Sequence, residues 1–360
     1  MVFQLMTSKN LFTVGEGIIG PADNKSGCSV ERNLSENFFY CNMPESVTLD
    51  GLADIISGRG GAWLAREYVT GSGQIYTWHK NVSGRTINSV LLLYNSNSTP
   101  VTVTFSNIGL TNGAGYNDRA AWEDYYNGRN APVTMTLQAN DFKSVMLQSG
   151  IQNGNNFGKV ARFKMNGTGL YFYDLAYASN SGTATDYAPH DESTSRPRGL
   201  GQGFYENMTV RLTLTDTAAT QAFSLGGIYA AEQDNRDSFM GKELIHITDS
   251  ATGSSNASYD LYGCYGVQMR INLTINNQCS STKKVRIFMG SYDDDTGGYA
   301  FCRFNKQFYK AYTPLIIGPY EYVDVLYDDA LPRGESTVTF DYVVPATASA
   351  PSIIGARWVY

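Results

Sequence analysis

The stretch YGVQMRINLTINNQCSSTKKVRIFMG, residues 265–290, decides the fold class. Apolar residues occupy every second position of its first half, which is the period of a strand with one buried and one solvated face. These positions are Val267, Met269, Ile271, Leu273 and Ile275. A second alternating run follows at 284–289, and the polar residues 276–283 between the runs predict an open loop. The stretch therefore predicts a β-hairpin with Leu273 at the centre of its buried face.

The same pattern recurs along the chain. SVLLLYNSNSTPVTVTF, residues 89–105, predicts a second hairpin with its loop at 95–100. Further strands are expected at 62–69, 74–80, 133–137, 142–147 and 207–214. Many short strands with turn signals between them are typical of all-β proteins, so the sequence predicts two antiparallel β-sandwiches of jelly-roll or immunoglobulin-like type.

The two hairpins also indicate an internal repeat. In the first half, a strand ending at Asn95 is followed by VTVTF, Tyr116, Pro132, a strand around Val145 and 160–163. In the second half, a strand ending at Asn277 is followed by KVRIFM, Tyr299, Pro314, a strand at 322–327 and 338–342. We expect this order to reflect a common architecture of the two halves.

A chain of 360 residues suggests about two domains. Residues 178–203 form the one long stretch without apolar periodicity and are the best candidate for a linker. The alternative is a functional loop of the first domain. We therefore expect an N-terminal sandwich at 1–177, a linker at 178–203 and a C-terminal sandwich at 204–360.

Composition excludes some classes of function. Apolar residues make up 42% of the chain and charged residues only 17%, with a net charge of −6 and no basic patch. Binding to nucleic acid is not expected, because no cluster of Lys and Arg could neutralise phosphates. No stretch approaches the ~20 apolar residues of a membrane-spanning helix, and no secretory signal is recognised in the opening MVFQLMTSKNLF as given.

The five cysteines are odd in number. The predicted hairpin register brings Cys264 and Cys302 to the same end of the sheet, so we expect them to form a disulfide. Cys28 and Cys41 are the second expected pair. Cys279, in the polar loop at the opposite end of the hairpin, is then the free thiol and a candidate for an intermolecular contact. The alternative is five reduced, buried thiols.

The segment YDDDTGGY, residues 292–299, is the one candidate metal site. Asp293, Asp294 and Asp295 lie beside glycines, and calcium prefers such oxygen-rich loops. The spacing differs from that of a helix-loop-helix calcium site, and we favour an acidic, solvated loop. No other cofactor is expected.

Motifs of catalysis are not recognised. His79, His190 and His246 lie far apart in the sequence and are interpreted as ordinary surface or strand histidines. There is no G-x-S-x-G elbow, phosphate-binding loop or dinucleotide fingerprint. A pair of distant carboxylates of the glycosidase kind would be invisible in one sequence. We expect the protein not to be an enzyme, with a secreted glycoside hydrolase as the alternative.

Tyrosine is the stronger functional signal, with 25 residues in the chain. Tyr side chains suit both protein contacts and stacking on sugar rings. We expect a structural protein that associates with copies of itself into a surface layer or filament. A carbohydrate-binding module for surface polysaccharide is the alternative, and it would need an exposed row of Trp or Tyr on one sheet face. A hydrolase would need a cleft with converging carboxylates.

Three segments carry a resemblance to a known family: LAREYVTGSGQIYTWHKN at 64–81, LLYNSNSTPVTVTF at 92–105 and YGCYGVQMRINLTINN at 262–277. With KKVRIFM, GGYAF and PLIIGPYEYVDV further on, the chain resembles the tandem β-sandwich region of uncharacterised secreted or cell-envelope proteins of Gram-positive bacteria. In those proteins this region often follows a copper amine oxidase-like N-terminal stalk domain, which is not recognised here. The resemblance spans most of residues 62–360 and implies an extracellular or cell-surface location, with no catalytic residues to carry over.

Overall fold

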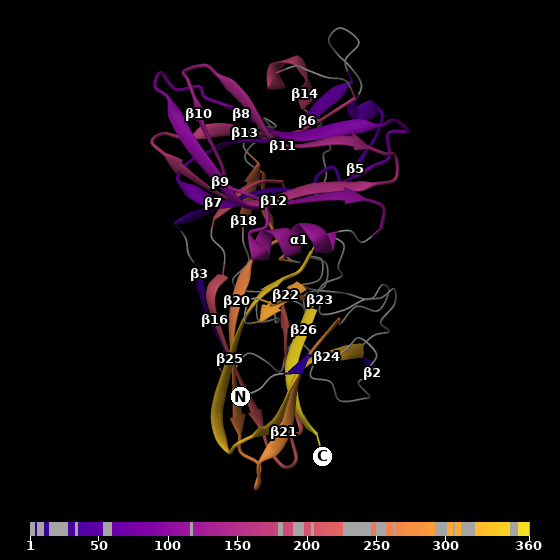
Figure 1. Ribbon diagram of the computed structural model, residues 1–360, viewed down its shortest axis with the longest axis vertical. Helices are drawn as coiled ribbons and strands as arrows, with labels where there is room; N and C mark the ends of the chain where they lie inside the picture. The colour runs from indigo at the N-terminus through magenta and orange to yellow at the C-terminus, as the bar shows by residue number, and fades with distance from the viewer. Residues whose placement is uncertain are drawn as a thin grey trace. The chain divides into compact units, whose positions relative to one another are not determined.

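The computed structural model describes residues 4–5, 11–13, 28–32, 35–52, 60–115, 118–178, 183–189, 198–202, 205–225, 246–249, 257–261, 264–291, 301–304, 307–310, 321–345 and 352–359. The chain forms two compact units (Figure 1). Unit 1 comprises Met1–Arg32, Phe204–Leu244 and Leu261–Tyr360, and unit 2 comprises Asn33–Gly203 and Ile245–Asp260.

Unit 2 is a sandwich of two sheets. The described strands of the five-stranded sheet are, in spatial order, β11 (Phe142–Ile151), β8 (Ile87–Tyr94), β13 (Leu170–Tyr177), β6 (Gly61–Val69) and β14 (Ala188–Pro189). Those of the nine-stranded sheet are β10 (Val133–Leu137), β9 (Val101–Gly113), β12 (Asn156–Asn166), β7 (Ser72–Asn81), β4 (Glu36–Cys41), β15 (Arg198–Gln202), β18 (His246–Asp249) and β19 (Ala257–Asp260), with β5 (Ser46–Val47) on β7. A short 3-10 helix, η2, spans Asp50–Leu52. The order β6-β13-β8-β11 against β7-β12-β9-β10 is that of a jelly roll, which confirms the predicted fold class.

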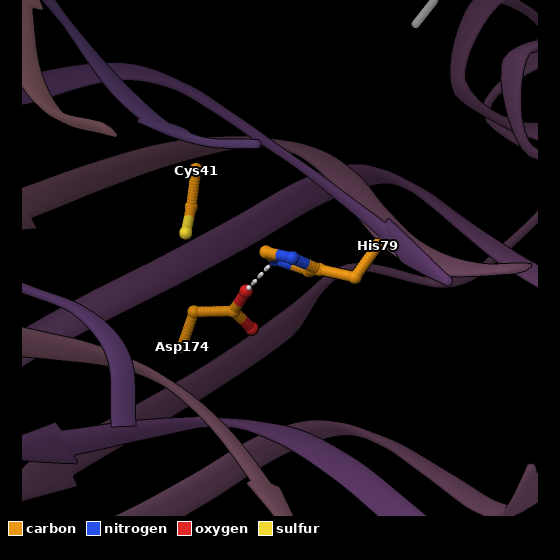
Figure 2. Close-up of side chains that lie close together, drawn as sticks. All are labelled: Cys41, His79 and Asp174. Atoms are coloured by element: carbon orange, nitrogen blue, oxygen red, sulfur yellow. Dashed lines mark hydrogen bonds and ion pairs between the residues drawn. The ribbon is translucent and has the colours of Figure 1, made fainter. Parts of the chain in front are cut away.

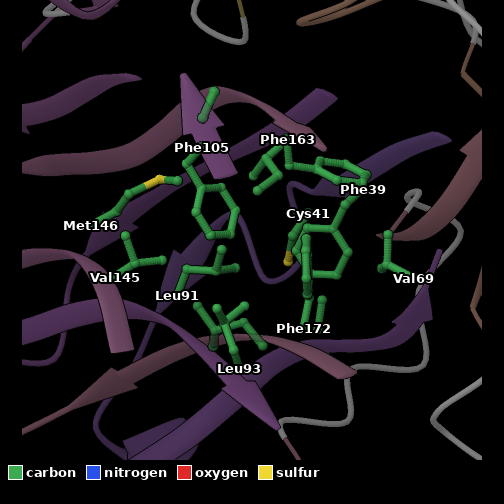
Figure 3. Close-up of a cluster of buried hydrophobic side chains, with 14 of the residues drawn as sticks. Phe39, Cys41, Val69, Leu91, Leu93, Phe105, Val145, Met146, Phe163 and Phe172 are labelled. Carbon is green, nitrogen blue, oxygen red and sulfur yellow. The ribbon is translucent and has the colours of Figure 1, made fainter. Parts of the chain in front are cut away.

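The core of unit 2 lies between these sheets (Figure 3). Every second residue of each strand points inward, so Leu91 and Leu93 of β8 meet Phe105 of β9 and Phe163 of β12. Phe172 of β13 lies at the centre, with its ring centroid 5.3–6.0 Å from those of Phe163, Phe39 and Phe105. The inward positions read from the sequence are therefore buried, but several outward residues of β7, β8 and β12 are buried as well.

Both predicted hairpins are wrong, and in the same way. β20 (Met269–Asn277) pairs with β16 and β25, whereas β21 (Lys283–Ser291) pairs with β24 and β26 in another sheet. In unit 2, β8 and β9 likewise belong to different sheets. A loop of a few residues can return a strand beside its partner or carry it over to the other layer ~10 Å away, and alternation does not distinguish the two. The predicted faces are correct, since Leu273 is buried and Asn272 is half-buried.

A buried asparagine holds each of these crossing loops. Asn95 donates from Nδ2 to the carbonyl oxygens of Leu137 and Gln138, at 3.1 and 3.0 Å, and accepts from the backbone N–H of Asn97 at 3.0 Å. Asn277 donates to the carbonyl oxygens of Leu331 and Pro332 and accepts from the backbone N–H of Cys279. The two loops are thus built on one plan.

Unit 1 repeats the strand order of unit 2. One described sheet contains β23 (Gln307–Lys310), β22 (Phe301–Phe304), β25 (Gly334–Val343), β20, β16 (Tyr205–Leu214) and β3 (Cys28–Arg32). The other contains β1 (Gln4–Leu5), β24 (Glu321–Leu331), β21, β26 (Ser352–Val359) and β17 (Thr220–Leu225), with β2 (Leu11–Thr13) on β24. β16 pairs with β20 in parallel, whereas their counterparts β6 and β8 are separated by β13. Loss of a middle strand antiparallel to both neighbours leaves those neighbours parallel, which explains the pairing.

The sheet positions correct the later landmarks of the predicted repeat. β8 and β9 correspond to β20 and β21, as expected. β10 occupies the place of β24, however, and β11, which contains Val145, occupies the place of β25. The expected match of Val145 with the strand at 322–327 is therefore off by one strand.

The division into units also differs from the expected domains. The first 32 residues belong with the C-terminal half, because β3 pairs with β16 while β1 and β2 pair with β24. Residues 245–260 belong to unit 2, where β18 pairs with β15. The expected linker at 178–203 contributes β14 and β15 to the sheets of unit 2. Its described residues belong to the first sandwich, but they include two strands and do not form the linker or the loop that the sequence suggests.

One α-helix interrupts the all-β pattern of the described residues. α1 (Asp118–Asn127) lies along the outer face of the nine-stranded sheet (Figure 1). Its buried residues include Ala121, Trp122, Tyr125 and Tyr126, which lie on one face of a helix. Gly109 of β9 permits the close approach, because a Cβ there would collide with the carbonyl of Ala121.

Candidate functional site

An aromatic row crosses the outer face of the five-stranded sheet in unit 2. Phe142 of β11 is opposite Tyr94 of β8, Tyr94 is opposite Tyr171 of β13, and Tyr171 is opposite Tyr68 of β6. Inward placement of the alternate residues in these strands fixes this outward direction. We call Phe142, Tyr94, Tyr171 and Tyr68 the aromatic row.

The rings of the row contact one another in sequence. Phe142 and Tyr94 are stacked with centroids 4.3 Å apart, and Tyr94 lies 6.2 Å from Tyr171 at an interplanar angle of 21°. Tyr68 meets Tyr171 edge to face at 5.1 Å. Tyr68 is 37% exposed and the other three are half-buried. The row is therefore partly open to solvent, with Tyr68 as its most exposed member.

Polar groups surround the row. The Tyr68 hydroxyl donates to Asn97 Oδ1 at 3.2 Å and accepts from the backbone N–H of Gly169 at 3.1 Å. The Tyr94 hydroxyl lies 3.4 Å from Asn140 Oδ1. The guanidinium of Arg66 lies over the ring of Tyr171, 4.6 Å from its centroid. The surface thus combines aromatic carbon, amides and one cation.

The far side of this face is covered. Arg66 also contacts the ring of Tyr173, which meets Trp63 edge to face at 6.2 Å. Burial raises the pKa of the Tyr173 hydroxyl above its ordinary value. The short 3-10 helix η3 (Ala184–Asp186) and Tyr187 pack against this second cluster. Within the described residues of this face, Tyr68 is exposed and the rest of the aromatic row is half-buried, whereas Trp63 and Tyr173 are buried.

A second constellation lies inside the sandwich (Figure 2). Cys41 of β4, His79 of β7 and Asp174 of β13 are buried, and their sulfur, nitrogen and oxygen atoms lie within 4.8 Å of one another. All three occupy inward positions of their strands, as does Lys159 of β12. We call Cys41, His79, Lys159 and Asp174 the core network.

Hydrogen bonds fix the protonation of His79. Its Nδ1 lies 2.6 Å from the carbonyl oxygen of Pro44 and its Nε2 lies 2.9 Å from Asp174 Oδ2. Because a carbonyl and a carboxylate can only accept, both ring nitrogens donate and His79 is an imidazolium. Burial lowers the pKa of His79, but the Cys41 sulfur and the Asp174 carboxylate outweigh it and raise the pKa to about 10.

Lys159 forms a second ion pair with Asp174. Lys159 Nζ lies 2.7 Å from Asp174 Oδ1 and 2.6 Å from Ser89 Oγ, with both charged side chains fully buried. Burial raises the pKa of Asp174, but the Lys159 ammonium and His79 outweigh it and hold the pKa at about 2. Asp174 is thus an anion between two cations.

The core network is a poor fit for a metal ion. The bond from Nδ1 to Pro44 leaves Nε2 of His79 as the ligand atom, as in many metal sites. That atom carries a proton held by Asp174, and the Lys159 ammonium lies on the same carboxylate. A bound cation would have to displace the proton and would lie next to a positive charge.

The predicted disulfides are wrong. Cys41, Cys264 and Cys279 are free, buried thiols. Cys41 lies in β4 of unit 2, whereas Cys28 lies in β3 of unit 1. The pairing of Cys264 with Cys302 assumed a hairpin register that does not exist, and burial raises the pKa of the Cys264 thiol to about 12. Cys279 is free as expected, but it is fully buried and not an exposed contact.

The remaining sequence-based candidates lie outside the side chains that the structure describes. Asp293, Asp294 and Asp295, proposed for calcium, lie outside the described residues, as does His190. For Cys28, Cys302 and His246 the structure describes only the backbone.

Sequence reasoning missed both sites. It interpreted His79 as an ordinary histidine and did not single out Lys159 or Asp174. One signal was available, because Lys159 takes an inward position between Phe157 and Ala161 in an alternating strand. The aromatic row needs the order of four strands, which no local pattern contains.

Comparisons with known proteins add little. No protein-family model matches the sequence, and a search of curated proteins gives no match. Among solved structures, the chain is similar to the N-terminal CBM22-1-CBM22-2 tandem domain of Paenibacillus barcinonensis Xyn10C, with 12% identity over 86% of this chain and 91% of that one and a TM-score of 0.15. It is also similar to the PBSX exported protein XepA, with 9% identity over 87% and 88% of the two chains and a TM-score of 0.18. At these TM-scores the likenesses do not bear on function.

Within the described residues, no helix has the length and apolar character needed to cross a membrane.

Proposed function

We propose that unit 2 binds a polysaccharide chain through the aromatic row, as a non-enzymatic module of a secreted or cell-surface protein. The observation that carries the proposal is the row itself. A carbohydrate-binding module needs aromatic residues aligned on an open sheet face, and Phe142, Tyr94, Tyr171 and Tyr68 are aligned across four neighbouring strands.

The chemistry of the row suits a sugar. Tyr68 offers an exposed ring on which the C–H face of a pyranose can stack. The hydroxyls of Tyr68 and Tyr94 and the amides of Asn97 and Asn140 can exchange hydrogen bonds with sugar hydroxyls. The row runs across the strands, so its length suits an extended chain of several sugar units rather than a single monosaccharide.

Affinity electrophoresis against soluble glucans, xylans and cell-wall polysaccharides tests the proposal. We expect at least one polymer to retard the protein, and Tyr68→Ala and Tyr171→Ala each to weaken binding by tenfold or more, about 1.4 kcal/mol. Val82→Ala is the matched control, because Val82 is 40% exposed and lies beyond the opposite end of β8. Equal retardation of the Tyr68 and Val82 variants would count against the aromatic row.

Self-association is the second candidate, and the same row favours it. Tyr-rich surfaces with amides at their rim suit contacts between proteins as well as contacts with sugars. Light scattering of the wild type and the Tyr68→Ala variant separates the two candidates. Self-association would be favoured by two results together. The wild type would form oligomers that the Tyr68→Ala substitution dissociates, and no polysaccharide of the panel would bind the protein.

A further inference from the structure

The ion pair of Lys159 and Asp174 lies in the apolar interior of the sandwich, where burying a charge costs free energy. Both side chains are fully buried and their Nζ and Oδ1 atoms lie 2.7 Å apart. Their nearest inward neighbours along the strands are apolar: Phe157 and Ala161 flank Lys159, and Phe172 and Ala176 flank Asp174. Removing two charges from water costs several kcal/mol per ion, which such a pair only partly recovers.

The pair also bridges the two layers of the sandwich. Lys159 belongs to β12 of the nine-stranded sheet and Asp174 belongs to β13 of the five-stranded sheet. Each strand is bonded on both sides by neighbours, so the two side chains are held facing one another. Groups fixed in this way react with effective concentrations of about 10⁵–10⁸ M.

We infer that Lys159 and Asp174 condense into an amide, a covalent cross-link between the two sheets, with release of one water molecule. The ammonium first passes one proton to Oδ1 along their hydrogen bond, which gives a neutral amine and a carboxylic acid. The amine lone pair then forms a bond to Cγ of Asp174, and the electron pair of the carbonyl bond moves onto Oδ2.

The intermediate collapses without an external reagent. The carbonyl bond to Oδ2 re-forms, and the bond between Cγ and Oδ1 breaks with its electron pair on Oδ1. A second proton from the nitrogen joins Oδ1, which leaves as water. Three hydrogens on nitrogen become one on the amide and two on water, and one positive and one negative charge are lost together.

His79 and Ser89 are placed for this reaction. Nε2–H of His79 points at Oδ2, the atom on which negative charge develops, at 2.9 Å. A donor aimed at a developing oxyanion lowers the barrier. Ser89 Oγ lies 2.6 Å from Nζ and orients the amine. In the product, the amide N–H donates to Ser89 and the amide oxygen accepts from His79, so both hydrogen bonds survive while the buried ion pair disappears.

Mass spectrometry of the denatured, full-length protein tests the inference. We expect the wild type to be lighter than its sequence by one water molecule, and digestion to yield a branched peptide that joins the segments around Lys159 and Asp174. Lys159→Met should restore the full mass. Lys164→Met, at an exposed position of the same strand, should still lose one water. A wild type of full mass, or a lost water that maps to any other residue, overturns the inference.

The role of His79 has its own readout. In newly synthesised protein, sampled over time after cell-free translation, the His79→Gln variant should form the lighter species at least tenfold more slowly than the wild type, and circular dichroism of the purified variant checks that it folds. An unchanged rate in folded His79→Gln protein would show that His79 does not assist the reaction. The existence of the cross-link is decided separately, by the mass measurement.

Discussion

The two outer faces of the unit 2 sandwich both carry aromatic side chains, but these side chains differ in how far they are exposed to solvent. On the nine-stranded sheet, the rings of Phe38, Tyr40, Tyr76 and Trp78 are at most 7% exposed, and Trp122 of α1 packs against Tyr76. On the five-stranded sheet, no helix within the described residues is packed on the aromatic row, and Tyr68 is 37% exposed. An abundance of tyrosine therefore does not identify a binding surface. What decides is whether another element covers the rings.

The largest expected effect is on the covered face. Trp122→Ala should destabilise unit 2 by about 3–5 kcal/mol, because it removes the largest fully buried side chain and leaves a cavity beside Tyr76, Tyr125 and Tyr126. Denaturation in urea measures the loss. A cost near that of an exposed residue would show that α1 does not seal this face.

The next effect concerns the close approach of α1. Gly109→Ala should cost about 1–3 kcal/mol, because the added Cβ collides with the backbone carbonyl of Ala121 and the helix has to move. Asn112→Ala on the same strand, where the side chain is exposed, should stay within about 0.5 kcal/mol. Equal thermal midpoints for the two variants would contradict the packing described here.

On the open face the expected effect on stability is smaller. Tyr68→Ala should cost about 1 kcal/mol, since its ring is partly solvated and its loss leaves no closed cavity. The same substitution should have the larger effect on binding given above. Urea denaturation that gave a cost as large as that of Trp122→Ala would mean that the aromatic row serves packing rather than recognition.

The smallest effect tests the outer surface of α1. Arg119 Nε lies 2.7 Å from Glu123 Oε1, one helical turn away, and the Arg119 side chain is 51% exposed. A double-mutant cycle with alanine at both positions should give a coupling of about 0.2–0.5 kcal/mol, because exposed ion pairs on a helix are weak. A coupling above about 1 kcal/mol would show that the pair is less solvated than its exposure indicates.

Alternation of apolar residues predicted the strands and their buried faces well. Leu273 and Asn272 lie on the expected sides of β20, and β6, β7 and β16 match their predicted ranges within a few residues. Alternation reports only which side of a strand faces a core. It carries no information on which strand lies beside it, so both crossing loops were taken for hairpin turns.

Each crossing loop begins with an asparagine, which is visible in the sequence but does not by itself indicate a crossing. Asn95 and Asn277 lie at the same point of the repeat. Each side-chain amide donates a hydrogen bond to a backbone carbonyl at the point where the strand leaves its sheet and its own backbone pairing ends. Asparagine is common throughout this sequence, however, and its role depends on carbonyl groups 42 and 54 residues away.

The core network could not be assembled from the sequence for a related reason. Cys41, His79, Lys159 and Asp174 come from four strands in two sheets, and only the jelly-roll order brings them together. The cysteine pairs were predicted from that same missing information. With the strand order unknown, Cys41 and Cys264 were assigned partners, whereas both are free thiols in the structure.

The placement of the first strands has a consequence for the order of events during synthesis. β3 completes an edge of β16, and β1 pairs with β24 through Gln4 and Tyr327, so these segments emerge from the ribosome long before their partners. Contacts between such distant residues form slowly, because the chain between them must first be closed into a loop. Most of unit 2 is complete once residue 203 has been made. β3 must wait for β16, and β1 and β2 must wait for β24 (Glu321–Leu331). During that time the edges of these strands are open to wrong partners.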